Sequence, residues 1–144
     1  MNTGSLRRAS AACALLLLSS CAALEQRTLK PTDQTSVVKA GQWGKVYRGG
    51  YVELASVGSA DAGWRLRSEI EITPGILSGV YYIYLCTQGN EHCTSVAQAQ
   101  ISFKAEAGHS YQVRAREQVN GSNRFWIWIV DEANGRVVGG TPPA

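Results

Sequence analysis

The chain has 144 residues, which suits a single domain, and a formal net charge of +3 at pH 7. Its basic side chains are scattered singly between Arg27 and Arg136. Without a basic stripe that could follow a phosphate backbone, the sequence gives no support for nucleic acid binding.

Residues 1–20 have the form of a secretory signal peptide. Arg7 and Arg8 supply a charged start, and an apolar run follows from Ala9 to Leu18. This run is shorter than the roughly 20 residues that span a bilayer as a helix, so we expect export without a permanent transmembrane segment. The arginine pair also occurs in twin-arginine signals, but its context, "GSLRRASA", favours ordinary export in unfolded form.

Cys21 closes a lipobox, the acylation pattern of bacterial lipoproteins. Leu18, Ser19 and Ser20 supply the aliphatic and small residues that precede the cysteine in this pattern. A thiolate is a strong nucleophile and can take a diacylglyceryl group as a thioether. We therefore expect Cys21 to be the lipidated first residue of the mature protein. The alternative is an ordinary secreted protein cut within "CAALE".

A lipid on Cys21 would tether the protein to a membrane, since each buried methylene contributes about 0.8 kcal/mol and two or more chains hold stably. Ala22 follows the cysteine, where an aspartate would signal retention at the inner membrane. By analogy with that sorting rule, we expect the periplasmic face of the outer membrane rather than the inner membrane. Cleavage also removes Arg7 and Arg8 and leaves the mature chain nearly neutral.

Residues 21–36 are expected to form the lipidated cysteine and a polar linker. The segment "AALEQRTLKPTDQTS" contains Pro31 and shows no sustained helical or strand period. Residues 37–144 then form the single folded domain.

Three segments of this domain alternate between apolar and polar residues, as half-buried strands do. They are "WRLRSEIEI" (64–72), "AQISFKAE" (99–106) and "YQVRARE" (111–117). The core-facing residues they predict are Trp64, Leu66, Ile70, Ile72, Ala99, Ile101, Phe103, Ala105, Tyr111, Val113 and Ala115.

Two further runs, "VYYIYLC" (80–86) and "FWIWIV" (125–130), are apolar on both sides and predict central strands that are covered on both faces. Turn signals separate the runs at Pro74-Gly75, Asn120-Gly121 and Asn134-Gly135, the last predicting a type I′ hairpin. Seven to nine short strands without a convincing helix predict an all-β domain. We expect a small antiparallel β-sandwich, Ig-like or transthyretin-like, with a small β-barrel as the alternative.

Cys86 and Cys93 flank "TQGNEH" at the base of a predicted hairpin. In an oxidising compartment the two are expected to form a disulfide. His92 adjoins Cys93 and raises the alternative of a metal site. The spacing lacks C-x-x-C and a second cysteine/histidine pair, so no metal and no cofactor are expected.

The sequence shows no arrangement of residues that is typical of a catalytic site. His92 and His109 both fall in predicted loops, and no serine lies in a G-x-S-x-G context. The carboxylate pair Glu69/Glu71 is expected to form ion pairs on a wet strand face, and in Asp131/Glu132 the aspartate is expected to cap a turn. We therefore expect no enzyme activity and no catalytic residues.

The remaining candidates for a binding site are tryptophans. Trp126 and Trp128 share one side of their strand, and Trp64 and Trp43 lie in other segments. Both sides of that strand could simply be core. Alternatively, a partly exposed face with Trp126, Trp128 and Trp64 could stack on a ligand or partner, because indoles give large contact area at little entropy cost.

The C-terminal half resembles a group of small, largely uncharacterised envelope lipoproteins of proteobacteria. The resemblance rests on "FKAEAGHSY", matching F-x-A-x-x-G-x-x-Y, and on "DEANGRVV", matching a closing D-x-x-(T/N)-G-(R/K)-V-V hairpin. It covers roughly residues 70–140 and implies a β-domain and an envelope location. In these motifs Gly108 is expected to form a turn, and Tyr111 to enter the core with its hydroxyl on a backbone group.

Together these features favour a lipoprotein that acts without catalysis, as an envelope accessory or protein-binding module. A glycan or small-ligand binder that uses the tryptophan face is the first alternative, and an inhibitor of a lysozyme-type hydrolase is the second. An exposed tryptophan cleft would favour a ligand, whereas an open strand edge would favour a protein partner.

Overall fold

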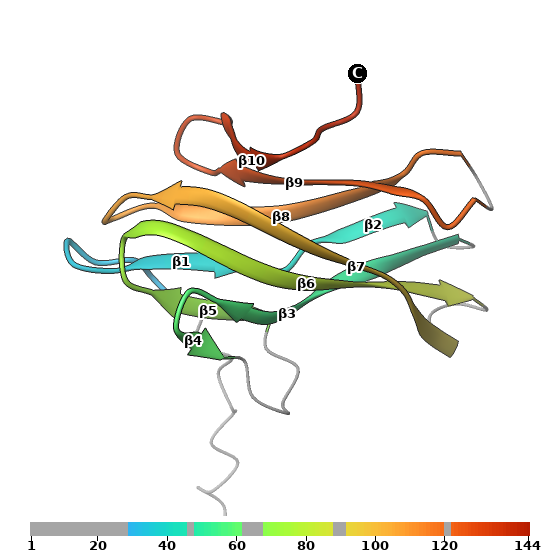
Figure 1. The fold of residues 1–144 in the computed structure, drawn as a ribbon, viewed down its shortest axis with the longest axis horizontal. Coiled ribbons are helices and arrows are strands. Elements are labelled where there is room, and N and C mark those ends of the chain that lie inside the picture. Colours follow the sequence, from blue (N-terminus) through green and yellow to red (C-terminus); the bar gives the residue numbers. More distant parts are fainter. Residues whose placement is uncertain (1–28, 46–47, 62–67, 88–91, 120–121) are drawn as a thin grey trace, which may run out of the picture.

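The computed structural model describes residues 29–45, 48–61, 68–87, 92–119 and 122–144. Within these ranges the chain forms ten strands and no helix, arranged as two sheets that enclose one core (Figure 1). The expected β-sandwich is confirmed, although the described ranges contain ten strands rather than seven to nine, and β6 and β7 are long. In the described ranges neither sheet closes into the alternative barrel.

The first sheet, called sheet A, is mixed rather than wholly antiparallel. Its order is β10 (Val137–Gly140), β9 (Phe125–Asp131), β8 (Ser110–Glu117), β1 (Ser36–Lys39) and β5 (Glu69–Ile72). The pair β1–β8 is parallel because the segments that lead into both strands run together. There Gly108 N donates to Thr35 O at 3.0 Å, and Val37 N donates to His109 O at 3.1 Å.

The second sheet, sheet B, contains the long strands. Its order is β2 (Gln42–Lys45), β3 (Arg48–Val57), β6 (Gly75–Thr87) and β7 (His92–Ala105), and β4 (Ala60–Asp61) pairs with β3. The predicted central run "VYYIYLC" lies in β6 between β3 and β7, as expected. The expected cover on both faces is wrong, because in the described ranges only the face with Tyr81 and Ile83 packs against the other sheet. In the described ranges β7 is an edge strand that pairs with β6 alone.

The core follows the alternation of the strands, which gives each sheet one apolar face. Among the predicted inward residues, Ile70, Ile72, Ile101, Phe103, Ala105, Tyr111, Val113 and Ala115 are buried, and Ala99 packs against them. Trp64 and Leu66 lie outside the described residues. Sheet B contributes Val52, Leu54, Tyr81 and Ile83 to the same core.

The β9–β10 hairpin differs from the predicted type I′ turn. Gly135 has a φ of 73°, but Asn134 does not adopt the left-handed conformation that this turn requires. Instead Gly135 N donates to Asp131 O at 2.8 Å, which closes a longer turn. The Pro74-Gly75 turn joins β5 to β6 as expected, and Asn120-Gly121 lies outside the described residues.

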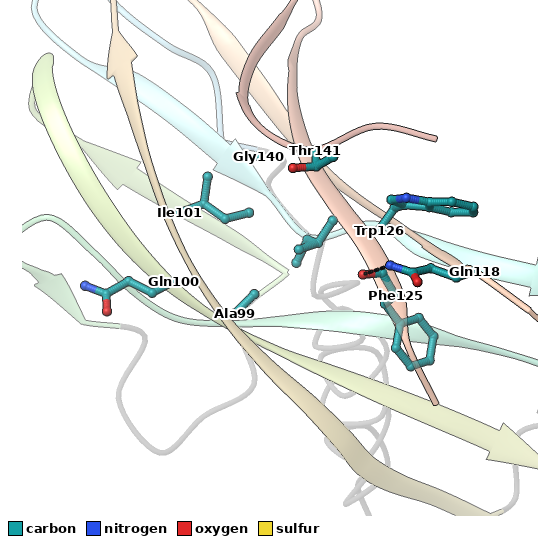
Figure 2. A pocket seen from close by; sticks show the side chains of 9 residues that line it. Ala99, Gln100, Ile101, Gln118, Phe125, Trp126, Gly140 and Thr141 are labelled. Carbon is teal, nitrogen blue, oxygen red and sulfur yellow. Dashed lines mark hydrogen bonds between the residues drawn. The ribbon is translucent and has the colours of Figure 1, made fainter. Parts of the chain in front are cut away.

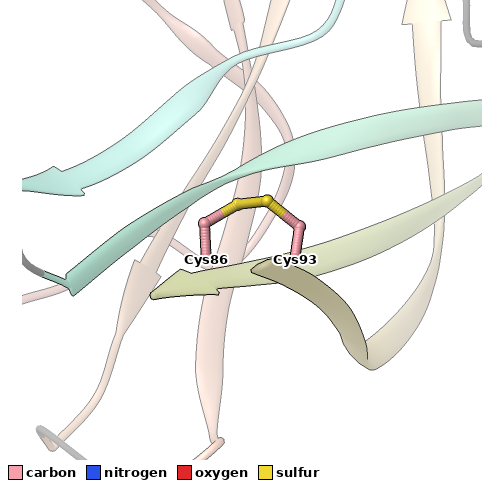
Figure 3. Close-up of a disulfide and its surroundings, with 2 residues drawn as sticks. All are labelled: Cys86 and Cys93. Carbon is pink, nitrogen blue, oxygen red and sulfur yellow. A yellow bond between two sulfur atoms is a disulfide. The ribbon is translucent and has the colours of Figure 1, made fainter. Parts of the chain in front are cut away.

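The predicted disulfide is present. Cys86 and Cys93 face each other across the β6–β7 ladder, and their sulfur atoms are bonded (Figure 3). Cys86 is buried and Cys93 is exposed, so the bond fixes the outer end of the hairpin to the rest of sheet B.

Candidate binding site between β7 and β9

A slot of about 360 Å³ opens at the edge of the sandwich where the two sheets separate. In Figure 2 the residues of β7 lie on one side, and those of β9 with Gln118 lie on the other. The lining residues are Ala99, Gln100, Ile101, Gln118, Phe125, Trp126, Ile127, Gly140 and Thr141.

The slot exists because β10 is much shorter than the strands beside it. β10 pairs with β9 only from Trp128 to Val130, and the ladder ends where Thr141 N donates to Ile127 O at 2.9 Å. Gly139 packs so close to Phe103 of β7 that a Cβ at this position would lie 3.0 Å from the Phe103 Cβ. β10 therefore covers the C-terminal part of β7 and leaves the middle of this strand facing the slot.

The slot surface is mixed in character. Ala99, Ile101, Phe125 and Ile127 supply apolar groups, and Gln118 and Thr141 supply an amide and a hydroxyl. The Gln100 amide points away from the slot, where its Nε2 donates to Ser78 Oγ at 3.1 Å (Figure 2). Gln118 Nε2 donates to Phe125 O at 3.5 Å, which holds this amide at the mouth (Figure 2). The volume of the slot lies at the lower end of the range of small ligand pockets.

Trp126 and Trp128 share one face of β9, as their spacing predicted, and this face is the outer one of sheet A rather than a second core face. Ile127 and Ile129 between them pack toward the core, whereas the two indoles are partly exposed. Trp126 also lines the slot, so the slot extends around the edge of β9. Trp64 lies outside the described residues and is not placed with them.

Two arginines that the sequence analysis missed share this face. In the β8–β9 ladder Arg116 lies opposite Trp126, and Arg114 lies opposite Trp128. Both arginines are exposed, and Arg114 Nε donates to Gln112 Oε1 at 3.2 Å. The alternation in "YQVRARE" could have placed both arginines on the wet face, but not beside the tryptophans, because the strand pairing was unknown.

A second polar cluster, which we call the His109 corner, fastens one end of the sandwich. His109 Nδ1 lies 2.8 Å from Asp131 Oδ2. The buried Asp131 carboxylate also accepts hydrogen bonds from Ala133 N and Asn134 Nδ2, both at 2.9 Å. Asp131 thus caps the turn, as predicted. Tyr111 enters the core beside it and accepts a hydrogen bond from Glu106 N at 2.7 Å, also as predicted.

The Asp131 carboxyl is held in its ionised form. Burial alone would raise its pKa, but the hydrogen bonds from Ala133 and His109 outweigh burial, and the pKa of Asp131 lies below its usual value. His109 Nε2 lies 4.0 Å from Glu106 Oε2. In the described ranges no hydroxyl or thiol is hydrogen-bonded to this nitrogen. The corner therefore has the geometry of a structural brace.

The outer face of sheet B carries an aromatic cluster that the sequence did not single out. The rings of Tyr51 and Tyr84 stack with centroids 4.8 Å apart, next to Glu53. The hydrogen bond of Tyr84 to the Glu53 carboxylate, with burial adding to it, raises the pKa of Tyr84 to about 12. Because the two rings stack on each other, each ring occupies the space beside the other.

No family model, curated protein or solved structure matches the chain. The resemblance to envelope lipoproteins therefore rests on the sequence motifs given above, and the site is interpreted from its own geometry.

Among the other predicted positions, Cys21 lies outside the described residues. His92 begins β7 and is not in a loop as expected. Glu69 accepts a hydrogen bond from Leu29 N at 2.7 Å, and its expected arginine neighbours at 65 and 67 are outside the described ranges. In the ranges described, no three metal-ligating side chains gather, and no helix is long and apolar enough to cross a membrane.

Proposed function

We propose that the protein is a lipid-anchored, non-catalytic binding module of the bacterial envelope. Cys21 would hold it on the periplasmic face of the outer membrane. The domain would bind an extended segment of another envelope protein along the edge of β7. The lipobox supports the anchor, and the open edge of β7 beside the slot supports the binding mode.

The observation that carries the binding mode is the unprotected edge of β7. In the described ranges this strand pairs on one side only, and from Thr94 to Gln100, before the part that β10 covers, it contains no charged residue and no proline. Exposed edges are normally protected by lysines, prolines or short length, because they pair readily with other chains. A long strand edge without such protection is suited to accept an added strand.

Backbone pairing alone does not select among peptide sequences, and the slot would supply this selectivity. A peptide strand beside β7 would place alternate side chains toward the slot, where Phe125, Trp126 and Ile127 offer apolar contact. Gln118 and Thr141 at the mouth could orient the polar groups of such a strand.

The anchor is tested by fatty-acid labelling of cells that express the wild type or Cys21→Ala. We expect palmitate on the wild type alone, and release of the variant from the membrane fraction. Labelling that survives Cys21→Ala would overturn the anchor.

The edge is tested by placing a charge in the slot. Ala99→Lys puts an ammonium group among apolar side chains, whereas Ser102→Lys adds the same charge on the same strand at an exposed position outside the slot. We expect Ala99→Lys to abolish capture of the cross-linked partner and Ser102→Lys to retain it. Equal capture by both variants would reject this edge as the binding site.

A small amphiphile is the second candidate occupant, because the slot has the volume of a ligand pocket and Trp126 lines it. Recovery of a tightly bound lipid or glycan in place of a polypeptide would favour this candidate. Hydrolase inhibition by a projecting histidine is not favoured at His109, because Asp131 holds that ring.

A further inference from the structure

The outer face of sheet A over β8 and β9 combines two cations with two indoles. We call Arg114, Arg116, Trp126 and Trp128 the Trp–Arg face. The register sets each arginine directly opposite one tryptophan, so the four side chains form two adjacent cross-strand pairs. The guanidinium groups are exposed and the indoles partly so, and in the described ranges no third layer covers this face.

The chain that leads to the proposed anchor leaves from the same face. Leu29 N donates to Glu69 Oε2 at 2.7 Å. Glu69 lies on the outer side of β5, since its neighbour Ile70 is buried in the core. Leu29 is eight positions after Cys21, so the two residues can lie at most about 28 Å apart. A lipid on Cys21 would therefore hold the outer side of β5 within about 28 Å of the membrane surface, which leaves the rest of the outer face of sheet A within reach of the bilayer.

The residue types of the Trp–Arg face fit the surface that this geometry places nearby. Indoles favour the headgroup level of a bilayer, and guanidinium groups pair with phosphate in a two-pronged geometry. The acidic residues Glu69 and Glu71 lie on β5, which is separated from β8 by β1. On sheet A these carboxylates therefore lie toward the β5 edge, and the two arginines lie on β8. The half of the sheet formed by β8 and β9 is the part suited to anionic lipid.

We propose that the Trp–Arg face docks onto anionic lipid headgroups of the membrane that holds the anchor. This inference rests on the proposed lipid anchor and adds an orientation to it. With β8 and β9 on the lipid, the domain is not simply suspended from its linker but lies against the bilayer.

The test uses the lipidated protein in vesicles whose lipids carry bromine near the headgroup, which quenches nearby indoles. One set contains phosphatidylglycerol and the other only phosphatidylcholine. We expect stronger tryptophan quenching in the anionic vesicles, reduced by high salt. Replacing Trp126 and Trp128 with phenylalanine should remove this difference and so assign it to these two indoles.

Charge variants separate docking from general attraction. Arg114→Gln with Arg116→Gln should lower the docking equilibrium constant about 25-fold, which is about fivefold for each arginine. Arg124→Gln with Arg136→Gln removes the same charge from exposed loop positions and should change the constant less than threefold. Equal losses in the two double variants would overturn the assigned face.

The test also distinguishes failure of docking from failure of the anchor. If the protein remains attached to both vesicle types with the same quenching, docking is wrong and the anchor stands. If the wild type does not remain attached to vesicles of either composition, the anchor is wrong and docking fails with it.

Discussion

His109 Nδ1 and Asp131 Oδ2, 2.8 Å apart, join the turn before β8 to the hairpin after β9. The same carboxylate binds Ala133 N and Asn134 Nδ2. One buried charge therefore holds the β9–β10 hairpin in place, and β10 in turn forms one end of the slot.

Replacing this charge should destabilise the protein. Asp131→Asn weakens charge-assisted hydrogen bonds, so we expect the free energy of unfolding to fall by about 2 kcal/mol. Denaturant unfolding at pH 7 measures this change. Glu71→Gln, at an exposed position, is the control and should leave the value within about 0.5 kcal/mol.

The same carboxylate sets a pH dependence. Because the pKa of Asp131 in the folded state lies below the usual 3.8, the unfolded chain binds the proton more tightly. The stabilisation is fully present above pH 3.8 and is lost as the pH falls through the lower folded value. Unfolding measured from pH 6 down to about 2 should show this loss in the wild type and a smaller slope in Asp131→Asn. Identical slopes would contradict the account.

Two tyrosines should respond in opposite directions to loss of the hydroxyl. The Tyr81 hydroxyl is buried and has no hydrogen-bond partner among the described residues, and burial holds its pKa above the usual range. Tyr81→Phe should therefore raise the free energy of unfolding by about 1 kcal/mol. Tyr111→Phe removes the acceptor for Glu106 N and should lower it by a similar amount. Shifts of the same sign would show that the Tyr81 hydroxyl has a partner in solution.

The disulfide should stabilise the domain through its short loop. Cys86 and Cys93 are seven positions apart, so replacing both with serine should lower the free energy of unfolding by about 2–3 kcal/mol. A reductant should shift the unfolding of the wild type toward that of the variant, and it should leave the variant unchanged. A wild type that is indifferent to reductant would contradict this role.

Local pattern predicted which residues form the core, because period-2 alternation depends only on neighbours along the chain. Ile101, Phe103 and Ala105 follow it directly. The pairing of Cys86 with Cys93 was also local, since a short hairpin connects them. The tyrosine of "AGHSY" entered the core for the same reason, because a turn and its strand are adjacent in sequence.

Strand partners could not be predicted in the same way. The parallel pairing of β1 with β8 joins segments more than seventy positions apart, and alternation carries no information about it. The slot depends on that larger arrangement. Ala99 and Phe125 come to lie on opposite sides of it only when sheets A and B stack. For the same reason the sequence identified the tryptophans but not the arginines opposite them.

Photo-cross-linking in living cells tests the central claim most directly. A photoreactive amino acid at position 118, at the mouth of the slot, is compared with one at position 71, on the exposed side of β5. The account predicts one discrete polypeptide adduct from position 118, none from position 71, and loss of the adduct when Ala99→Lys is added. Adducts of equal yield from both positions, or an adduct from position 118 that survives Ala99→Lys, would contradict binding at the edge of β7.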